Sequence, residues 1–285
     1  MKMYLSILCL TFLSASSALF AQQAKPGKGY ASVNGIQMYY EISGKGEPLV
    51  LLHGGLGSTG MFNSILPALI ADRQVIAVDL YGHGRTALVN RPMTMKDMAN
   101  DVSGLLQKLG LKKADILGYS MGGGVALQLA FQHPDMVRKL VIVSAGFARE
   151  GYFPEILAMQ EQMNAGTAEF LKKTPIYQSY VSIAPRPDDF SSLITATSEM
   201  IRKPYDWSED VKKLRMPVLL IYGDADMIRT EHMVQFYHLL GGGLKDAGWN
   251  REHMSQNRLA ILPNLTHYEV FQAPETVKAV TQFLK

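Results

Sequence analysis

Short apolar runs alternate with helical stretches along most of this 285-residue chain. The apolar runs, which predict strands, cover residues 30–33, 37–42, 48–52, 75–78, 114–117, 140–143, 218–222 and 259–262. The stretches that predict helices cover residues 61–71, 95–109, 121–131, 230–240 and 276–284. Several of the strand runs are apolar throughout, which is typical of strands buried on both faces. The alternation therefore predicts an α/β fold, in which a mostly parallel sheet carries helices on both faces.

A serine lies between glycines at one junction of a predicted strand and a predicted helix, in the segment GYSMGG at 118–123. Gly118 and Gly122 permit a tight turn that lifts the Ser120 hydroxyl clear of the sheet. The turn also directs the free N–H groups at the start of the next helix into the same space, the Met121 N–H being the nearest. A plain serine N-cap is the alternative, but the flanking strand and helix are those that an exposed nucleophile requires.

Two further strands are followed by residues that complete a set with Ser120. The segment GDAD at 223–226 follows the strand at 218–222, and His267 comes soon after the strand at 259–262. Ligands of open parallel sheets bind at the carboxyl ends of the strands, so we expect these side chains at one edge. The order serine, acid, histidine allows His267 to take the Ser120 proton while a carboxylate orients the imidazole.

In these residues and the motifs around them, the chain resembles the α/β-hydrolase superfamily. The resemblance includes HGG at 53–55, DLYGHGRT at 79–86, GYSMGG at 118–123, GDAD at 223–226 and LTH at 265–267. It implies an α/β-hydrolase fold with Ser120, Asp226 and His267 as the catalytic residues. It also implies an oxyanion hole formed by the backbone N–H groups of Gly55 and Met121.

The acid of this set has more than one candidate. Family segments like GDAD usually supply the last aspartate, which is Asp226 here. A shift of one or two residues in the turn would bring Asp224 into its place. Glu150, which follows the strand at 140–143, is a more distant alternative.

The alternation of strands and helices breaks between about residues 147 and 215. In the family this position holds a lid of helices above the serine, so we expect a lid insertion here. A surface excursion without functional contact is the alternative. Aromatic residues and methionines in this segment are candidates for an apolar pocket: Tyr152, Phe153, Met159, Met163, Phe170, Tyr177, Tyr180 and Trp207.

The remaining histidines have structural interpretations. His53 and His83 lie in glycine-containing loops that their hydrogen bonds would hold in place. His133 suits the C-terminus of the helix after Ser120. The sequence lacks an H-E-x-x-H motif and a P-loop lysine, so we expect no metal and no cofactor. Surface positions are expected for the three others, His232, His238 and His253.

The expected reaction is hydrolysis of a carboxylic ester or lactone of a small to medium apolar substrate, through an acyl-enzyme on Ser120. Haloalkane dehalogenases and epoxide hydrolases of this fold are disfavoured, because they use an aspartate nucleophile. Proline iminopeptidases usually carry a tryptophan where this chain has Met121. Other activities on the same fold stay open as alternatives, namely perhydrolase, carbon–carbon bond hydrolase and aminopeptidase. A non-catalytic small-molecule binder is a further alternative.

The N-terminal residues 1–21 combine an early lysine, an apolar stretch and small residues, which is typical of a secretory signal peptide rather than a membrane anchor. We therefore expect a secreted or periplasmic protein with a mature domain at 22–285. Cys9 is the only cysteine, so cleavage would leave no disulfide. The net charge of +3 gives no indication of nucleic-acid binding. The expected partner is a small-molecule ester, without a stable membrane anchor, and the oligomeric state is not indicated.

Overall fold

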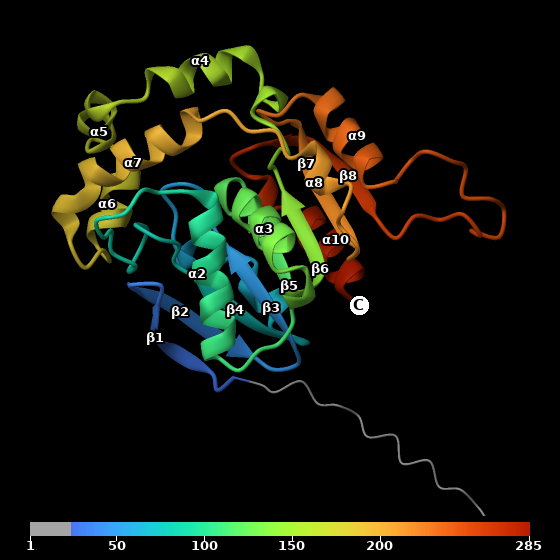
Figure 1. Ribbon diagram of the computed structural model, residues 1–285, viewed down its shortest axis with the longest axis horizontal. Helices are drawn as coiled ribbons and strands as arrows, with labels where there is room; N and C mark the ends of the chain where they lie inside the picture. The colour runs from blue at the N-terminus through green and yellow to red at the C-terminus, as the bar shows by residue number, and fades with distance from the viewer. Residues whose placement is uncertain (1–23) are drawn as a thin grey trace, which may run out of the picture.

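The computed structural model describes residues 24–285 and contains one eight-stranded sheet with helices on both faces (Figure 1). The strands are β1 (Gly27–Val33), β2 (Ile36–Gly44), β3 (Glu47–Leu52), β4 (Arg73–Val78), β5 (Ala114–Tyr119), β6 (Val137–Val143), β7 (Val218–Ala225) and β8 (Arg258–Thr266). Each strand run expected from the sequence lies within one of them. The expected signal peptide at 1–21 lies outside the described residues.

The sheet has the order β1-β2-β4-β3-β5-β6-β7-β8. Strands β1, β2 and β4 pair antiparallel, whereas every pairing from β4 through β3 to β8 is parallel. The carboxyl ends of β3, β5, β6, β7 and β8 therefore meet at one edge of the sheet. This edge receives the residues that follow those strands, which is where a ligand site is expected in such a sheet.

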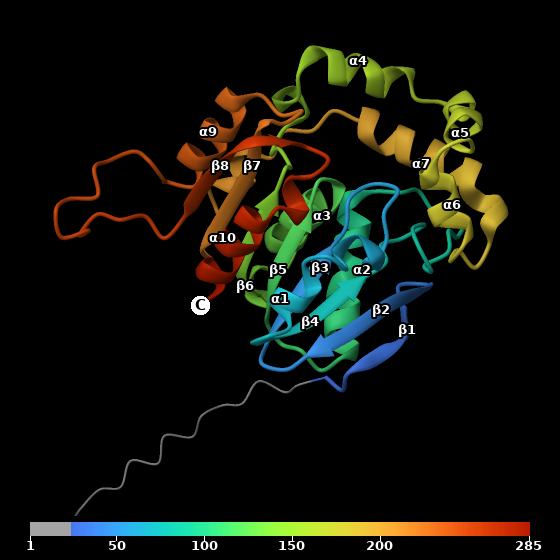
Figure 2. The same ribbon diagram turned by 180° about the vertical axis from the view of Figure 1, so that it is seen from behind.

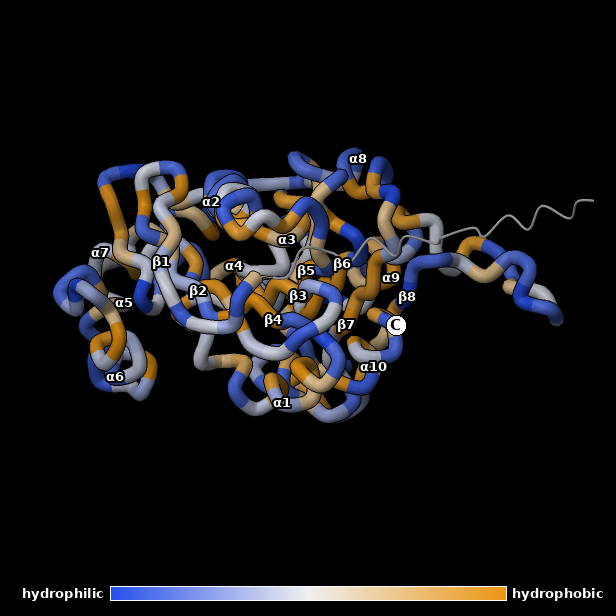
Figure 3. The backbone as a smooth tube through the Cα atoms, turned by 90° about the horizontal axis from the view of Figure 1, so that it is seen from below, coloured by the Kyte–Doolittle hydropathy of each residue, from blue (hydrophilic) through white to orange (hydrophobic). Residues whose placement is uncertain are grey.

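Five helices cover the two faces of the sheet: α1 (Leu66–Leu69), α2 (Met95–Lys108), α3 (Met121–Gln132), α9 (Thr230–Leu239) and α10 (Pro274–Leu284). Helices α2 and α3 lie in front of the strands in Figure 1, and α1 and α10 lie in front of them in the reverse view of Figure 2. Alternate residues of each strand point to opposite faces. Val50 and Leu52 of β3 accordingly belong to the core under α2 and α3, and Leu49 and Leu51 belong to the core under α1 and α10. Hydrophobic residues gather along the central strands of the sheet (Figure 3).

The helix expected over residues 61–71 is wrong in its extent. The structure has a 3₁₀ turn at Thr59–Phe62 and then the single-turn helix α1. The hydroxyl of Ser58 accepts a hydrogen bond from the Gly60 N–H and starts the first turn. Pro67 has no N–H to donate to the preceding turn, so a continuous helix cannot run through it and the helix restarts there.

Between β6 and β7 the chain forms five helices: α4 (Pro154–Gln162), α5 (Ala165–Leu171), α6 (Pro175–Val181), α7 (Phe190–Arg202) and α8 (Ser208–Val211). Helices α4 to α7 form an arch beyond the carboxyl ends of the strands (Figure 1). A loop at 241–257, between α9 and β8, extends away from the sheet on the side opposite to α5 and α6 (Figure 1). Trp249 in this loop is 99% exposed. Within residues 24–285, no helix has the length and apolar character needed to cross a membrane.

Candidate active site

The turn between β5 and α3 holds Ser120 in a backbone conformation that few side chains adopt. Its φ of 52° and ψ of −119° lie in a strained region for a residue other than glycine. A Cβ at Gly118 would overlap the carbonyl of Gly122, and a Cβ at Gly122 would overlap the carbonyl of Leu52. Glycine is therefore required on both sides of Ser120, because the turn packs against its own backbone at Gly118 and against the end of β3 at Gly122.

The structure brings Ser120, His267 and Asp226 into one hydrogen-bonded chain. The Oγ of Ser120 lies 3.0 Å from Nε2 of His267, and Nδ1 of His267 lies 3.0 Å from Oδ1 of Asp226. An ionised carboxylate only accepts hydrogen bonds, so Nδ1 donates to Asp226 and Nε2 is left to accept the serine proton. His267 is 5% exposed and Asp226 6% exposed, so both are largely removed from water. The arrangement suits nucleophilic catalysis by the serine.

Four donors fix the orientation of the Asp226 carboxylate. Besides His267, the Met227 N–H donates to Oδ1 over 2.8 Å. The Gly223 N–H, at 3.4 Å, and the Ser144 hydroxyl donate to Oδ2. Sequence reasoning missed Ser144, although its position directly after β6, at the same edge of the sheet, is a signal that could have found it.

The two alternative acids lie away from His267. Asp224 is exposed, and its Oδ1 accepts the Leu265 N–H over 3.3 Å. Glu150 is also exposed, and it begins the connection to the helices of the arch. A register shift between Gly223 and Ala225 of β7 turns the last aspartate of GDAD, rather than the first, toward the histidine.

Gly55 and Met121 both line the cavity that Ser120 lines. Met121 is the first residue of α3, and Gly55 lies in the loop after β3. Within residues 24–285, neither backbone N–H donates to a protein acceptor. Two free N–H groups beside the serine, one of them at a helix N-terminus, are suited to bind an oxygen that gains negative charge.

His53 and His83 have structural roles. His53 is fully buried, its Nε2 accepts the Leu80 N–H over 3.0 Å, and its Nδ1 lies 2.7 Å from the Gly54 carbonyl. His83 lies 2.9 Å from the Tyr81 carbonyl. Burial lowers the pKa of His53 to about 4 and that of His83 to about 3, so both are neutral near pH 7. Both histidines thus hold their loops, as expected from the sequence.

The surface position expected for His232 is wrong. Its ring stacks on Phe147 with the ring centroids 4.0 Å apart, and its Nε2 accepts the Phe147 N–H over 3.2 Å. Burial lowers the pKa of His232 to about 4. Helix α9 thus turns this histidine inward, against the chain that leads from β6 to the arch.

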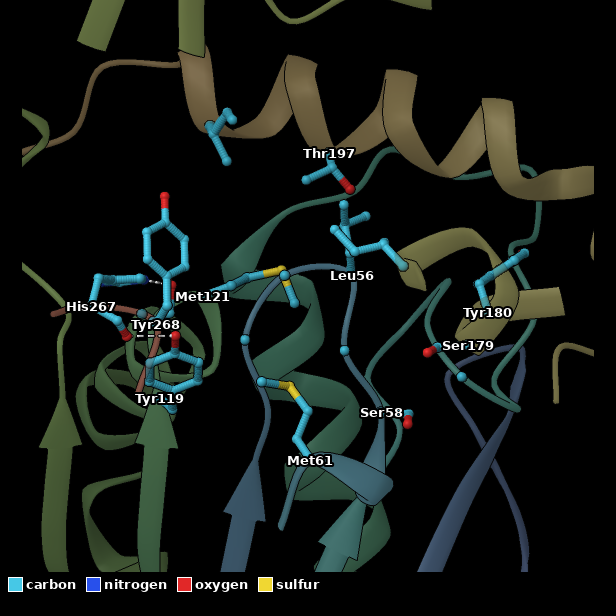
Figure 4. Close-up of a pocket in the computed structure, with 18 of the residues that line it drawn as sticks. Leu56, Ser58, Met61, Tyr119, Met121, Ser179, Tyr180, Thr197, His267 and Tyr268 are labelled. Carbon is cyan, nitrogen blue, oxygen red and sulfur yellow. Dashed lines mark hydrogen bonds between the residues drawn. The ribbon is translucent and has the colours of Figure 1, made fainter. Parts of the chain in front are cut away.

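A cavity of about 950 Å³ lies between the carboxyl edge of the sheet and the arch, with Ser120 and His267 in its wall. Figure 4 shows His267 and Tyr268 at one end of the view, and Ser179 and Tyr180 at the other. Of the aromatic and methionine candidates named from the sequence, four line the cavity: Tyr152, Met159, Met163 and Tyr180. The others do not. Phe170, for example, is 68% exposed. In the part of the chain that the structure describes, no group of three or more His, Cys, Asp or Glu side chains is arranged to hold a metal ion.

A mostly parallel sheet with a serine, a histidine and an aspartate joined at the carboxyl ends of its strands defines the class of α/β hydrolases. Comparison with known proteins shows the same class. A family model for the alpha/beta hydrolase fold matches residues 47–211. The chain belongs to the α/β-hydrolase family.

Among curated relatives, the chain is similar to the pimeloyl-[acyl-carrier protein] methyl ester esterase of Neisseria meningitidis serogroup B. The two are 32% identical over 248 residues, which cover 80% of this chain and 90% of the relative. Among solved structures, carboxylesterase CesB from Bacillus subtilis superposes with a TM-score of 0.67 at 22% identity, covering 92% of this chain and 93% of that one. The meta-cleavage product hydrolase of Pseudomonas fluorescens IP01 gives a TM-score of 0.68 at 22% identity, covering 91% and 97%. The two structures show a shared fold.

Proposed function

We propose that the protein is a serine hydrolase that cleaves a carboxylic ester or lactone. The hydrogen-bonded chain of Ser120, His267 and Asp226 in the wall of a large cavity carries this proposal. The similarity of the protein to a methyl ester esterase, over most of both sequences, supports the choice of an ester bond.

In the proposed reaction, Oγ of Ser120 attacks the substrate carbonyl while its proton passes to Nε2 of His267. The negative charge that forms on the carbonyl oxygen is bound by the N–H groups of Gly55 and Met121. His267 then gives the proton to the departing alkoxide, which leaves an acyl group on Ser120. Water, deprotonated by the same histidine, releases the acid and regenerates the serine. Asp226 holds the imidazole in the tautomer required and stabilises its charged form.

Replacement of the nucleophile tests the proposal. Ser120→Ala should lower kcat for p-nitrophenyl butyrate by about 10⁴- to 10⁶-fold, with an unchanged circular dichroism spectrum. Ser191→Ala is the matched control, because Ser191 lies on α7 outside the cavity wall. Wild-type turnover in purified Ser120→Ala protein would refute the mechanism.

Covalent labelling separates an enzyme from a small-molecule binder. A fluorophosphonate should label the wild-type protein rapidly at Ser120, because the serine is activated by His267. Folded protein that resists labelling would favour a binder. If the protein hydrolysed a carbon–carbon bond or an amide in preference to every ester tested, it would be a carbon–carbon bond hydrolase or an aminopeptidase instead.

We also propose that residues 1–21 direct export and that helices α4 to α7 act as a lid over the serine. The composition of the N-terminus supports export, and the cavity-lining residues that the arch contributes, such as Met159 and Tyr180, support the lid. Mass measurement of protein isolated from the periplasm or culture medium should show a chain that begins at Gln22, after cleavage at Ala21, or at Leu19, after cleavage at Ala18. A full-length cytoplasmic product would contradict the export proposal.

A further inference from the structure

The cavity has chemically different regions along its length, and this difference bears on the substrate class within the proposed function. The catalytic histidine lies at one end of the view in Figure 4, and Ser58 and Ser179 lie toward the other. Leu56, Met61 and Met121 lie between these two ends. Six methionines line the cavity as a whole: Met61, Met95, Met121, Met159, Met163 and Met227. Methionine side chains adapt to ligands of different shape, so this cavity suits a flexible alkyl chain.

Charged side chains line the cavity wall next to Ser58. They are Lys28 of β1, Glu41 of β2 and Arg85 of the loop after β4. Arg85 belongs beside Ser58 because Asp79 accepts the N–H groups of both Arg85, over 2.7 Å, and Thr59, over 2.6 Å. A substrate that extends from Ser120 past the methionines would bring its far end to this wall.

Two of these charged groups already satisfy one another. Lys28 Nζ lies 3.1 Å from Oε2 of Glu41. The other oxygen of Glu41 accepts the Tyr39 hydroxyl over 2.9 Å and the Thr59 hydroxyl over 3.4 Å. Glu41 therefore has little capacity left for a ligand, and the charge of Lys28 is compensated.

Arg85 is held differently. Its Cζ lies 4.7 Å from the centroid of the Tyr39 ring, so the guanidinium rests on an aromatic face. Its Nη1 forms an ion pair with Oδ2 of the buried Asp79 at 3.6 Å, a distance too long for a hydrogen bond. Among residues 24–285, no acceptor takes a hydrogen bond from the guanidinium, and the side chain is 29% exposed. The charge of Arg85 is thus paired with Asp79, but its planar guanidinium keeps unused hydrogen-bond donors in the cavity wall.

We propose that Arg85 binds a carboxylate at the far end of the substrate, so that the preferred esters are those whose apolar chain ends in an anionic group. The planar guanidinium matches a carboxylate with two parallel hydrogen bonds, which a neutral chain end cannot form. This inference rests on the proposed ester hydrolysis at Ser120 and adds the chemical class of the substrate.

A paired substrate series tests the inference. The monomethyl esters of straight-chain dicarboxylic acids with four to ten carbons are compared with the methyl esters of monocarboxylic acids of the same carbon number. At the chain length that reaches Arg85, kcat/KM should be about tenfold or more higher for the carboxylate-bearing ester. Equal values across the whole series would overturn the proposal.

Substitution of Arg85 assigns the preference to this side chain. Arg85→Gln should reduce the ratio of the two kcat/KM values toward one. Arg85→Lys should retain part of the preference, because the ammonium keeps the charge but cannot form the two parallel hydrogen bonds of a guanidinium. The ratio cancels any general loss of activity, since both substrates share that loss. Arg215→Gln, an exposed arginine outside the cavity, should keep the wild-type ratio. A preference that persists in Arg85→Gln would overturn the assignment.

Binding without turnover separates this inference from the proposed function. Both esters of each chain length in the series are titrated calorimetrically into Ser120→Ala protein. Tighter binding of a carboxylate-bearing ester than of its neutral counterpart, lost in Ser120→Ala/Arg85→Gln, supports the carboxylate site even if wild-type protein hydrolyses neither ester. Hydrolysis of both kinds of ester with equal binding at every chain length would leave the proposed function standing and the carboxylate site refuted.

Discussion

The hydroxyl of Ser144 donates a hydrogen bond to Oδ2 of Asp226, whose other oxygen contacts His267. Ser144 follows β6, Asp226 follows β7 and His267 follows β8, so three adjacent strands converge on one carboxylate. Ser144 touches neither Ser120 nor the space for the substrate and is a positioning residue in the proposed mechanism.

Ser144→Ala should lower kcat by about tenfold and leave KM unchanged, because one charge-assisted hydrogen bond that orients Asp226 is lost. Steady-state kinetics with p-nitrophenyl butyrate measures the effect. The control is Ser103→Ala, which also removes a buried hydroxyl but lies on α2, where the hydroxyl contacts Met136. Equal losses in the two variants would indicate a general effect of core substitution.

Asp226→Asn should lower kcat by about 10⁴-fold, because an amide in place of the carboxylate favours the wrong imidazole tautomer. Asp224→Asn is the matched control and should stay within a few-fold of wild type, since Asp224 contacts the Leu265 N–H and not His267. The comparison distinguishes the two aspartates of GDAD. A larger loss in Asp224→Asn than in Asp226→Asn would contradict the site described above.

Gly122→Ala should destabilise the protein by about 3 kcal/mol or more, because the added methyl overlaps the carbonyl of Leu52 at the end of β3. Gly55→Ala should leave the melting temperature nearly unchanged, since a Cβ there meets no atom within 4 Å. Thermal unfolding of the two variants gives the comparison. Similar melting temperatures for Gly122→Ala and wild type would show that the turn can relax.

Acid should destabilise the folded protein between pH 6.5 and about 4. His53, His83 and His232 have folded-state pKa values of about 4, 3 and 4, below the ordinary value of 6.5, because burial disfavours their charged forms. The unfolded chain therefore binds more protons in this window, and the stability present above pH 6.5 is lost as the pH falls. Each histidine contributes a slope of about 1.4 kcal/mol per pH unit.

Urea unfolding between pH 5 and 6.5 measures this slope above the range in which ordinary carboxylates titrate. His232→Gln should reduce the slope by about 1.4 kcal/mol per pH unit, which corresponds to one proton. Glutamine does not titrate, but it can still accept the hydrogen bond of the Phe147 N–H. His253→Gln, at an exposed position in the loop at 241–257, should leave it unchanged. An unchanged slope in His232→Gln would show that this histidine does not titrate differently in the two states.

Local sequence patterns were enough to predict the strands of this protein and the turn that carries Ser120. The strands are encoded in short apolar runs, and the turn at Ser120 is encoded in its glycines, because both depend on backbone sterics and on burial of neighbouring residues. The prediction of one helix over residues 61–71 was wrong for a local reason as well, because Pro67 cannot donate the backbone hydrogen bond that a continuous helix requires.

Tertiary structure decided which distant side chains meet. Asp226 rather than Asp224 faces His267 because β7 shifts register against β8. Ser144 joins them because β6 lies beside β7. The inward position of His232 and the charged wall around Arg85 likewise come from elements far apart in the chain. The sequence by itself determined the succession of strands and helices along the chain and the likeness of its motifs to one family. The contacts between strand ends were decided only when the sheet placed those ends at one edge, because such contacts depend on register and packing over long sequence separations.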